Sequence, residues 1–142
     1  MKGRTRIMKG IWTKVIMAAG VVVSLVALFF MFGGGQRYKS LTPNEAAKIM
    51  ESNRDCVVLD VRTQTEYGDG HIPGAVCLPI NDIRENAASV QATLPDKHQV
   101  LLIYCYAGRR AVEAAQLLSA MGYTNAYEFG GIVDWTGEVV TD

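Results

Sequence analysis

Cysteine and histidine are scarce in this sequence of 142 residues, which contains three of the first and two of the second. Cys56, Cys77 and Cys105 form no C-x-x-C pair, and no group of histidines lies near them. A zinc site needs such clustered ligands, and a disulfide framework needs paired cysteines at regular spacing. The sequence therefore argues against both kinds of structure, and we expect neither a metal nor a cofactor.

Internal repeats, low-complexity tracts and an excess of positive charge are also missing after residue 32. In that part of the chain, nine Lys and Arg residues stand against all 14 Asp and Glu residues, a balance of −5. Nucleic-acid-binding domains are typically basic, with Lys and Arg clustered on one face. The acidic balance therefore argues against nucleic acid as a partner.

The N-terminal part of the chain is basic and then strongly apolar. Residues 1–14 contain five Lys and Arg and no acid, and residues 15–32 are apolar except for Ser24. As a helix this run spans about 27 Å, close to the roughly 30 Å hydrocarbon core of a bilayer. We therefore expect a basic tail, a transmembrane signal anchor (15–32) and a glycine tether (33–37) before a domain at 38–142.

The charge asymmetry around the apolar run predicts its orientation in a membrane. Since five basic residues precede the run, the positive-inside rule places the N-terminus in the cytoplasm. The domain then lies on the outer, periplasmic or extracellular face. The alternative is a signal peptide that is cleaved to release a secreted protein.

Segments with the composition of strands and helices alternate over residues 38–142. Short runs typical of strands are 38–41, 56–59, 75–78, 100–105 and 125–129. Helical patterns begin at a capping box, Thr42-Pro43-Asn44-Glu45, and recur at 63–67, at 81–94 and beyond Arg110 to near Gly122. This alternation predicts an α/β domain of three layers, with a mainly parallel central sheet of about five strands.

The stretch that carries the chemistry is the expected strand 100–105, which ends at Cys105. A short loop with one glycine and two arginines follows, and small apolar residues at helical spacing come after it. Ligands of open α/β sheets bind at the carboxyl ends of strands, and a helix N-terminus binds anions. Loop N–H groups, the helix dipole, Arg109 and Arg110 would all stabilise a thiolate there. We therefore interpret Cys105 as a nucleophile.

Several motifs around this loop occur in one order along the chain. They are Asp60-Val61-Arg62, Glu66-Tyr67, Gly70-His71-Ile72-Pro73-Gly74-Ala75, Cys105-Tyr106-Ala107-Gly108-Arg109-Arg110 and Gly130-Gly131-Ile132 with Trp135. With these motifs the chain from about Tyr38 resembles a single rhodanese-like (sulfurtransferase) domain. The resemblance implies that Cys105 takes a sulfane sulfur from a small sulfur-containing anion such as thiosulfate. Cys105 would hold this sulfur as a persulfide and pass it to a thiophilic acceptor, cyanide or a thiol.

The resemblance also implies roles for residues near Cys105. The loop residues expected to bind the anion are Tyr106, Ala107, Gly108, Arg109 and Arg110. Arg110 would stabilise the anion or brace the loop, whereas Arg109 would lie at the rim and attract anionic donors. Asp60 and Arg62 are expected to support the site structurally, with Arg62 paired to a carboxylate such as Glu66. The ring of His71 would bond the backbone of its tight turn.

Three alternatives remain open on the sequence alone. Arg110 follows Cys105 as C-x4-R, whereas tyrosine phosphatases need C-x5-R, a position that Ala111 occupies here. Sulfur transfer is therefore favoured over phosphatase or arsenate reductase activity. The second alternative is a rhodanese-like binding or regulatory module with little turnover. The third is a disulfide between Cys56 and Cys77 in an oxidising compartment.

Overall fold

The computed structural model describes residues 38–141, so the expected tail, anchor and tether lie outside the described residues. Within that range no helix is long and apolar enough to cross a bilayer. The strands are β1 (Lys39–Ser40), β2 (Val57–Asp60), β3 (Val76–Cys77), β4 (Leu101–Cys105) and β5 (Ala126–Gly131). The helices are α2 (Pro43–Ser52), α3 (Gln64–Gly68), α4 (Ile80–Glu85), α5 (Ala87–Thr93), α6 (Arg109–Ala120) and the short 3-10 helix η1 (Ile132–Asp134).

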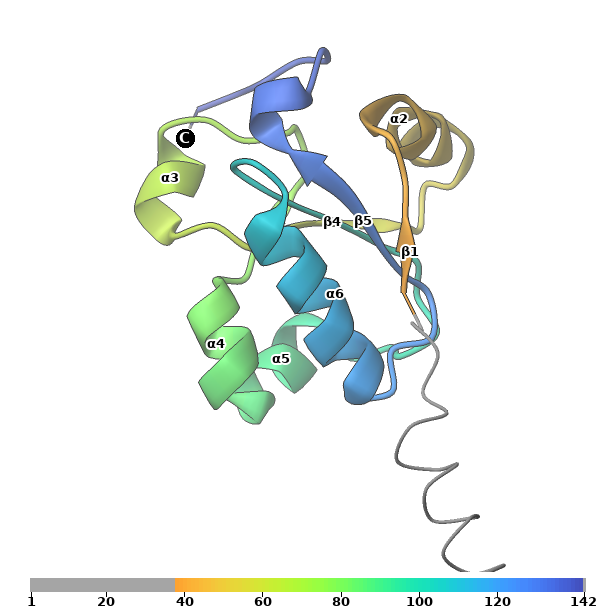
Figure 1. Cartoon of the computed structure of the whole chain (residues 1–142), viewed down its shortest axis with the longest axis vertical. Helices are drawn as coiled ribbons and strands as arrows, with labels where there is room; N and C mark the ends of the chain where they lie inside the picture. The colour runs from red at the N-terminus through yellow and green to blue at the C-terminus, as the bar shows by residue number, and fades with distance from the viewer. Residues whose placement is uncertain (1–37, 142) are drawn as a thin grey trace, which may run out of the picture. The chain divides into compact units, whose positions relative to one another are not determined.

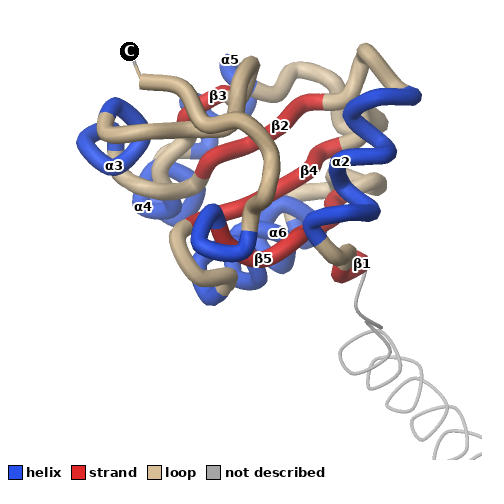
Figure 2. Tube along the Cα trace, turned by 90° about the horizontal axis from the view of Figure 1, so that it is seen from above, coloured by secondary structure: helices blue, strands red, loops and turns tan. Residues whose placement is uncertain are grey.

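The five strands form one sheet in the order β1-β5-β4-β2-β3, and every neighbouring pair is parallel. Helices α4, α5 and α6 cover one face of the sheet, and α2 lies on the other face (Figures 1 and 2). The predicted three-layer α/β domain is thus confirmed, and its sheet is parallel throughout. The carboxyl ends of β2, β4 and β5 meet at one edge, where the loops expected to carry the chemistry lie.

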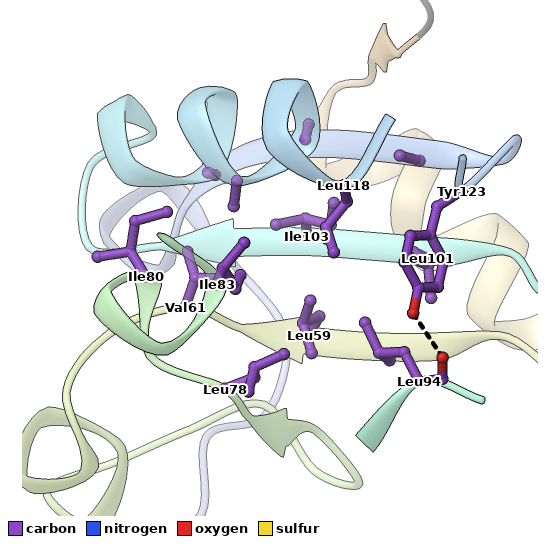
Figure 3. Close-up of a cluster of buried hydrophobic side chains, with 14 of the residues drawn as sticks. Leu59, Val61, Leu78, Ile80, Ile83, Leu94, Leu101, Ile103, Leu118 and Tyr123 are labelled. Carbon is purple, nitrogen blue, oxygen red and sulfur yellow. Dashed lines mark hydrogen bonds between the residues drawn. The ribbon is translucent and has the colours of Figure 1, made fainter. Parts of the chain in front are cut away.

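The central strand β4 is buried over its whole length and supplies side chains to two cores. Leu101, Ile103 and Cys105 belong to the cluster under α4, α5 and α6, which Figure 3 shows. Leu102 and Tyr104 belong to the cluster under α2. Because successive side chains of a strand point to opposite faces, this alternation directs the thiol of Cys105 to the α6 side of the sheet.

Two helices start with the same device, a capping box. The Thr42 hydroxyl accepts the Glu45 N–H while the Glu45 carboxylate accepts the Thr42 N–H, as the sequence predicts. Thr63 and Glu66 repeat both bonds at the start of α3. Each box satisfies backbone donors that a helix N-terminus leaves without partners.

The structure corrects one predicted element and extends two others. Residues 81–94 form two helices rather than one, since Asn86 leaves helical geometry (φ −130°, ψ 79°). Its side chain accepts the Ser89 N–H at 3.0 Å and so starts α5 as an N-cap, a role that asparagine favours. The last strand, expected to end at Phe129, runs on to Gly131. Helix α6, expected to begin beyond the two arginines, starts at Arg109 and so includes both of them.

Candidate active site

Cys105 closes β4 and lies at the floor of the loop that leads into α6. Cys105 is buried, with 1% of its surface exposed, and its Sγ accepts a hydrogen bond from the Gly108 N–H at 3.1 Å. Gly108 has a φ of +95°, a left-handed conformation that glycine adopts without strain, and it is the residue directly before α6. The chain therefore folds from strand to helix within three residues and turns an N–H group onto the sulfur.

The first turn of α6 follows this loop directly and carries further N–H donors. The N–H groups of the first residues of a helix have no partner within the helix, and they carry the positive end of its dipole. Here those residues are Arg109, Arg110 and Ala111, directly after Gly108. A thiolate or an anion at this position meets backbone N–H groups together with a positive dipole.

The loop rests on the two glycines at the end of β5, Gly130 and Gly131. A Cβ atom on Gly131 would lie 2.1 Å from the Tyr106 carbonyl oxygen and 2.5 Å from the Ala107 Cα, so only glycine fits there. The Val133 N–H donates to the same Tyr106 oxygen at 3.2 Å. The start of the loop is therefore held by close backbone packing and by a backbone hydrogen bond, while the Tyr106 side chain stays 55% exposed.

Arg110 braces the loop through an ion pair. Its Nη1 and Nη2 donate to Glu66 Oε2 and Oε1 at 2.8 and 2.7 Å. The hydrogen bonds from Arg110, with those from Thr63, hold the pKa of Glu66 down at about 2 against the opposing effect of burial. The same contact raises the pKa of Arg110. The Arg109 residue is exposed.

Asp60 and Arg62 form a buried pair at the carboxyl end of β2. The Arg62 Nη2 lies 2.6 Å from Asp60 Oδ2 and donates to the Gly70 carbonyl at 2.7 Å. Burial acts to lower the pKa of Arg62, but the hydrogen bonds and charge of Asp60 outweigh it and raise that pKa. Arg62 also lies over the Tyr104 ring, 5.7 Å from its centroid. Through the Gly70 carbonyl, this pair is joined to the loop after β2.

One predicted pairing is wrong. Arg62 was expected to pair with a carboxylate such as Glu66, but its carboxylate partner is Asp60, and Glu66 binds Arg110. The reason is geometric, because Asp60 lies two residues before Arg62 and its carboxylate also accepts the Arg62 N–H at 3.0 Å. The Glu66 carboxylate, at the start of α3, instead reaches the first turn of α6.

His71 bonds its own turn, as predicted. Its Nδ1 lies 3.0 Å from the Tyr67 carbonyl oxygen, and its ring stacks on the Tyr67 ring at 3.8 Å. The backbone of His71 exchanges two hydrogen bonds with Val140, where the end of the chain runs back past this turn. The histidine therefore ties the turn to the C-terminal segment.

The other two cysteines lie apart from each other and are free thiols. Cys77 pairs in register with Asp60, four residues beyond Cys56, so the two are separated by about 13 Å along the strand direction. A disulfide needs Cα atoms within about 7 Å, so the structure contradicts the alternative of a Cys56–Cys77 bridge. Burial raises the pKa of both thiols, that of Cys77 to about 11.

Glu128 is a side chain near the loop that was not predicted from the sequence. It is a buried carboxylate on β5 whose Oε2 accepts the Gly130 N–H at 3.0 Å. The signal in the sequence that could have identified it is a lone acid within an otherwise apolar strand, Ala126–Gly131.

Across residues 38–141 no three His, Cys, Asp or Glu side chains gather closely enough to hold a metal ion.

Comparison with known proteins bears on the same loop and its surroundings. The sequence model of the rhodanese-like domain matches residues 42–138, about two thirds of the chain. The chain belongs to the rhodanese-like domain family. The matched segment includes the Asp60–Arg62 pair, the Cys105 loop and the glycines at the end of β5.

Several rhodanese-like relatives are sulfurtransferases. The thiosulfate sulfurtransferase PspE of Escherichia coli is 37% identical over 76 residues, which cover 54% of this chain and 70% of that protein. The thiosulfate sulfurtransferase GlpE of Coxiella burnetii is 32% identical over 99 residues, 69% of this chain and 87% of the relative. A solved E. coli rhodanese with anions is 33% identical, has a TM-score of 0.51, and covers 61% of this chain and 98% of its own. The family relationship thus includes proteins that transfer sulfur from thiosulfate.

Proposed function

We propose that this protein is a sulfurtransferase that moves a sulfane sulfur from a donor such as thiosulfate to a thiol or cyanide through a persulfide on Cys105. The observation that carries the proposal is the 3.1 Å hydrogen bond from the Gly108 N–H to Cys105 Sγ, at the N-terminus of α6. A thiolate is the nucleophilic form of cysteine, and N–H donors together with a helix dipole stabilise it. The thiosulfate sulfurtransferases among the relatives support the same chemistry.

The proposed reaction has two displacements at sulfur. The Cys105 thiolate attacks the outer sulfur of thiosulfate, an S–S bond forms to the cysteine, and the S–S bond of thiosulfate breaks to release sulfite. A thiolate or cyanide then attacks the outer sulfur of the persulfide, and the Cys105 thiolate leaves. The electron pairs balance in each step, so neither an external oxidant nor a reductant is consumed.

The arginines take different parts in this proposal. Both ends of the Arg110 guanidinium are bonded to Glu66, and the guanidinium also interacts with Cys105, so Arg110 holds the first turn of α6 in place beside the thiol. Arg109 is exposed and attracts the anionic donor to the mouth of the loop. The backbone N–H groups of the loop then bind the anion, as in other anion-binding turns. The E. coli rhodanese structure solved with anions supports such a site.

The decisive experiment is mass spectrometry of the protein after treatment with thiosulfate. Covalent catalysis predicts a gain of one sulfur, about 32 Da, on the peptide that contains Cys105. Cys105→Ser should lose both this mass shift and sulfur transfer, while Cys77→Ser, the matched control, should retain both. Retained transfer in Cys105→Ser would overturn the proposal. Absence of a mass shift with every sulfane donor would instead favour the binding or regulatory module.

We further propose that residues 15–32 hold the domain at a membrane, with the domain on the outer face. The charge asymmetry of the sequence supports this orientation, since five basic residues precede the apolar run. Protease added to intact cells or spheroplasts should then cleave the domain. Protection of the domain would place it on the inner face, and release of a shortened soluble protein would show signal cleavage.

A further inference from the structure

Glu128 is an acid in an unusual place, the interior of the parallel strand β5. It is 7% exposed, and its neighbours Tyr127 and Phe129 pack in the cluster under α2. Ala126 belongs to the opposite cluster, so the alternation of the strand puts Glu128 on the α6 side, the side of Cys105. A buried carboxylate is costly unless it is hydrogen-bonded, so its contacts are informative.

The contact of Glu128 lies at an irregularity between β4 and β5. Ile103 is in register with Glu128 and Cys105 with Gly131, so β5 has one more residue than β4 over this interval. An extra residue of this kind is a β-bulge, which interrupts the ladder of backbone bonds and bends the strand. The Glu128 carboxylate accepts the N–H of Gly130, a residue of the bulge with a φ of +90°.

The bulge in turn contacts the loop that holds the thiol. A Cβ on Gly108 would lie 3.4 Å from the Gly130 Cα, so the two glycine backbones are in van der Waals contact. Gly131 lies still closer to the loop, under Tyr106 and Ala107. Since the Gly108 N–H donates to Cys105 Sγ, a displacement of the bulge changes the position of that donor.

We propose that Glu128 is a positioning residue for Cys105. Its carboxylate fixes the β5 bulge by accepting the Gly130 N–H, and the fixed bulge sets Gly108 so that its N–H points at the sulfur. The proposal deepens the proposed function and rests on it only for the sulfur-transfer reaction, because the position of the thiol is a property of the fold. None of the ion pairs in residues 38–141 includes Glu128. The hydrogen bond that its carboxylate accepts is the one from the Gly130 N–H.

The test compares two substitutions of Glu128. Glu128→Gln keeps an acceptor oxygen for the Gly130 N–H and removes the charge, whereas Glu128→Leu removes the acceptor at similar size. We measure alkylation of Cys105 by iodoacetamide, located by mass spectrometry, and sulfur loading from thiosulfate. Glu128→Leu should lower both rates about tenfold or more, and Glu128→Gln should stay within about twofold of the unmodified protein.

Controls separate this role from general stability. Alkylation of Cys77 should be unchanged in both variants, and Glu113→Leu, at an exposed acid of α6, should leave Cys105 alkylation unchanged. Equal losses in the Gln and Leu variants, or an unchanged or faster Cys105 rate in Glu128→Leu, would overturn the proposal. Alkylation of Cys105 does not depend on sulfur transfer from thiosulfate. If Glu128→Leu lowers the alkylation rate while the unmodified protein loads no sulfur, the proposed function is refuted and the positioning role stands.

A second measurement covers the case in which Glu128→Leu does not fold. In the unmodified protein, the Gly130 amide should exchange with solvent deuterium much more slowly than the exposed loop amide of Gly137, since its N–H is bonded to a buried carboxylate. Glu128→Gln should preserve that protection. Exchange of the Gly130 amide as fast as that of Gly137 would overturn the proposal.

Discussion

The Glu66 carboxylate and the Arg110 guanidinium meet in a fork of two hydrogen bonds, 2.8 and 2.7 Å long. Both side chains are about one third exposed, so this is not a deeply buried pair. The same carboxylate closes the capping box of α3 by accepting the Thr63 N–H and hydroxyl. One side chain therefore joins the start of α3 to the first turn of α6, 44 residues apart in sequence.

We expect Glu66→Gln to lower the rate of sulfur loading on Cys105 about tenfold, which corresponds to about 1.4 kcal/mol in the barrier. The amide cannot accept both ends of the fork, so the first turn of α6 is less firmly held. Glu45→Gln is the matched control, because Glu45 closes the same kind of capping box in α2 without binding an arginine. Equal rates in the two variants would show that the fork does not act on the loop.

Acid should weaken the contribution of Glu66 to stability. Its folded-state pKa is about 2, below the ordinary value of 4.5, chiefly because Arg110 donates to it. A lowered folded pKa stabilises the fold above the unfolded pKa, and this stabilisation is lost as the pH falls towards 2. Urea unfolding should therefore show a larger gap between the unmodified protein and Glu66→Gln at pH 7 than at pH 3. A gap that is constant with pH would contradict this assignment.

Gly131→Ala should displace the loop. Its Cβ would lie 2.1 Å from the Tyr106 oxygen, and the neighbouring atoms are backbone, which cannot rotate away. We expect a loss of about 1–3 kcal/mol in the free energy of unfolding, as for other overpacked sites. The rate of sulfur loading on Cys105 should fall too, and the corresponding rise in the barrier should exceed this loss of stability. Gly68→Ala is the control, because a Cβ there meets nothing within 4 Å. Full loading in Gly131→Ala would contradict this view of the loop.

Local signals in the sequence were sufficient for most of the fold. The capping box at Thr42 predicts the start of α2, and the apolar run ending at Cys105 predicts β4, because both depend on neighbours in the chain. Gly108 before the two arginines likewise predicts the turn from β4 into α6. The break at Asn86 was not predicted because residues 81–94 as a whole have helical composition. The hydrogen bond by which Asn86 caps α5 is visible only in the structure.

The partners of the charged residues could not be predicted in the same way. The sequence alone does not tell whether Glu66 pairs with Arg62 or with Arg110, because the answer depends on the placement of α3 against α6. The role of Glu128 depends on a bulge between β4 and β5, which is a property of strand register rather than of composition. Long-range pairing therefore sets those parts of the site that local pattern leaves open.

The Asp60–Arg62 pair makes the strongest prediction for stability. Asp60 is fully buried and Arg62 is 4% exposed, so Asp60→Leu leaves a guanidinium buried without its counter-charge. Removal of one partner of a buried pair costs about 3–5 kcal/mol, whereas removal of both partners costs much less. Urea unfolding should thus show a large loss in Asp60→Leu and partial recovery in Asp60→Leu/Arg62→Leu.

The exposed ion pair of Arg84 and Glu113 is the control for the stability loss expected in Asp60→Leu. Its side chains are 42% and 40% exposed, so solvent already screens the two charges, and Glu113→Leu should change the unfolding midpoint little. If Asp60→Leu had an equally small effect, Arg62 would have to find another acceptor. The Gly70 carbonyl, which already accepts its Nη2 at 2.7 Å, cannot replace a carboxylate because it carries no charge. A large loss therefore assigns Asp60 to the support of the loop after β2.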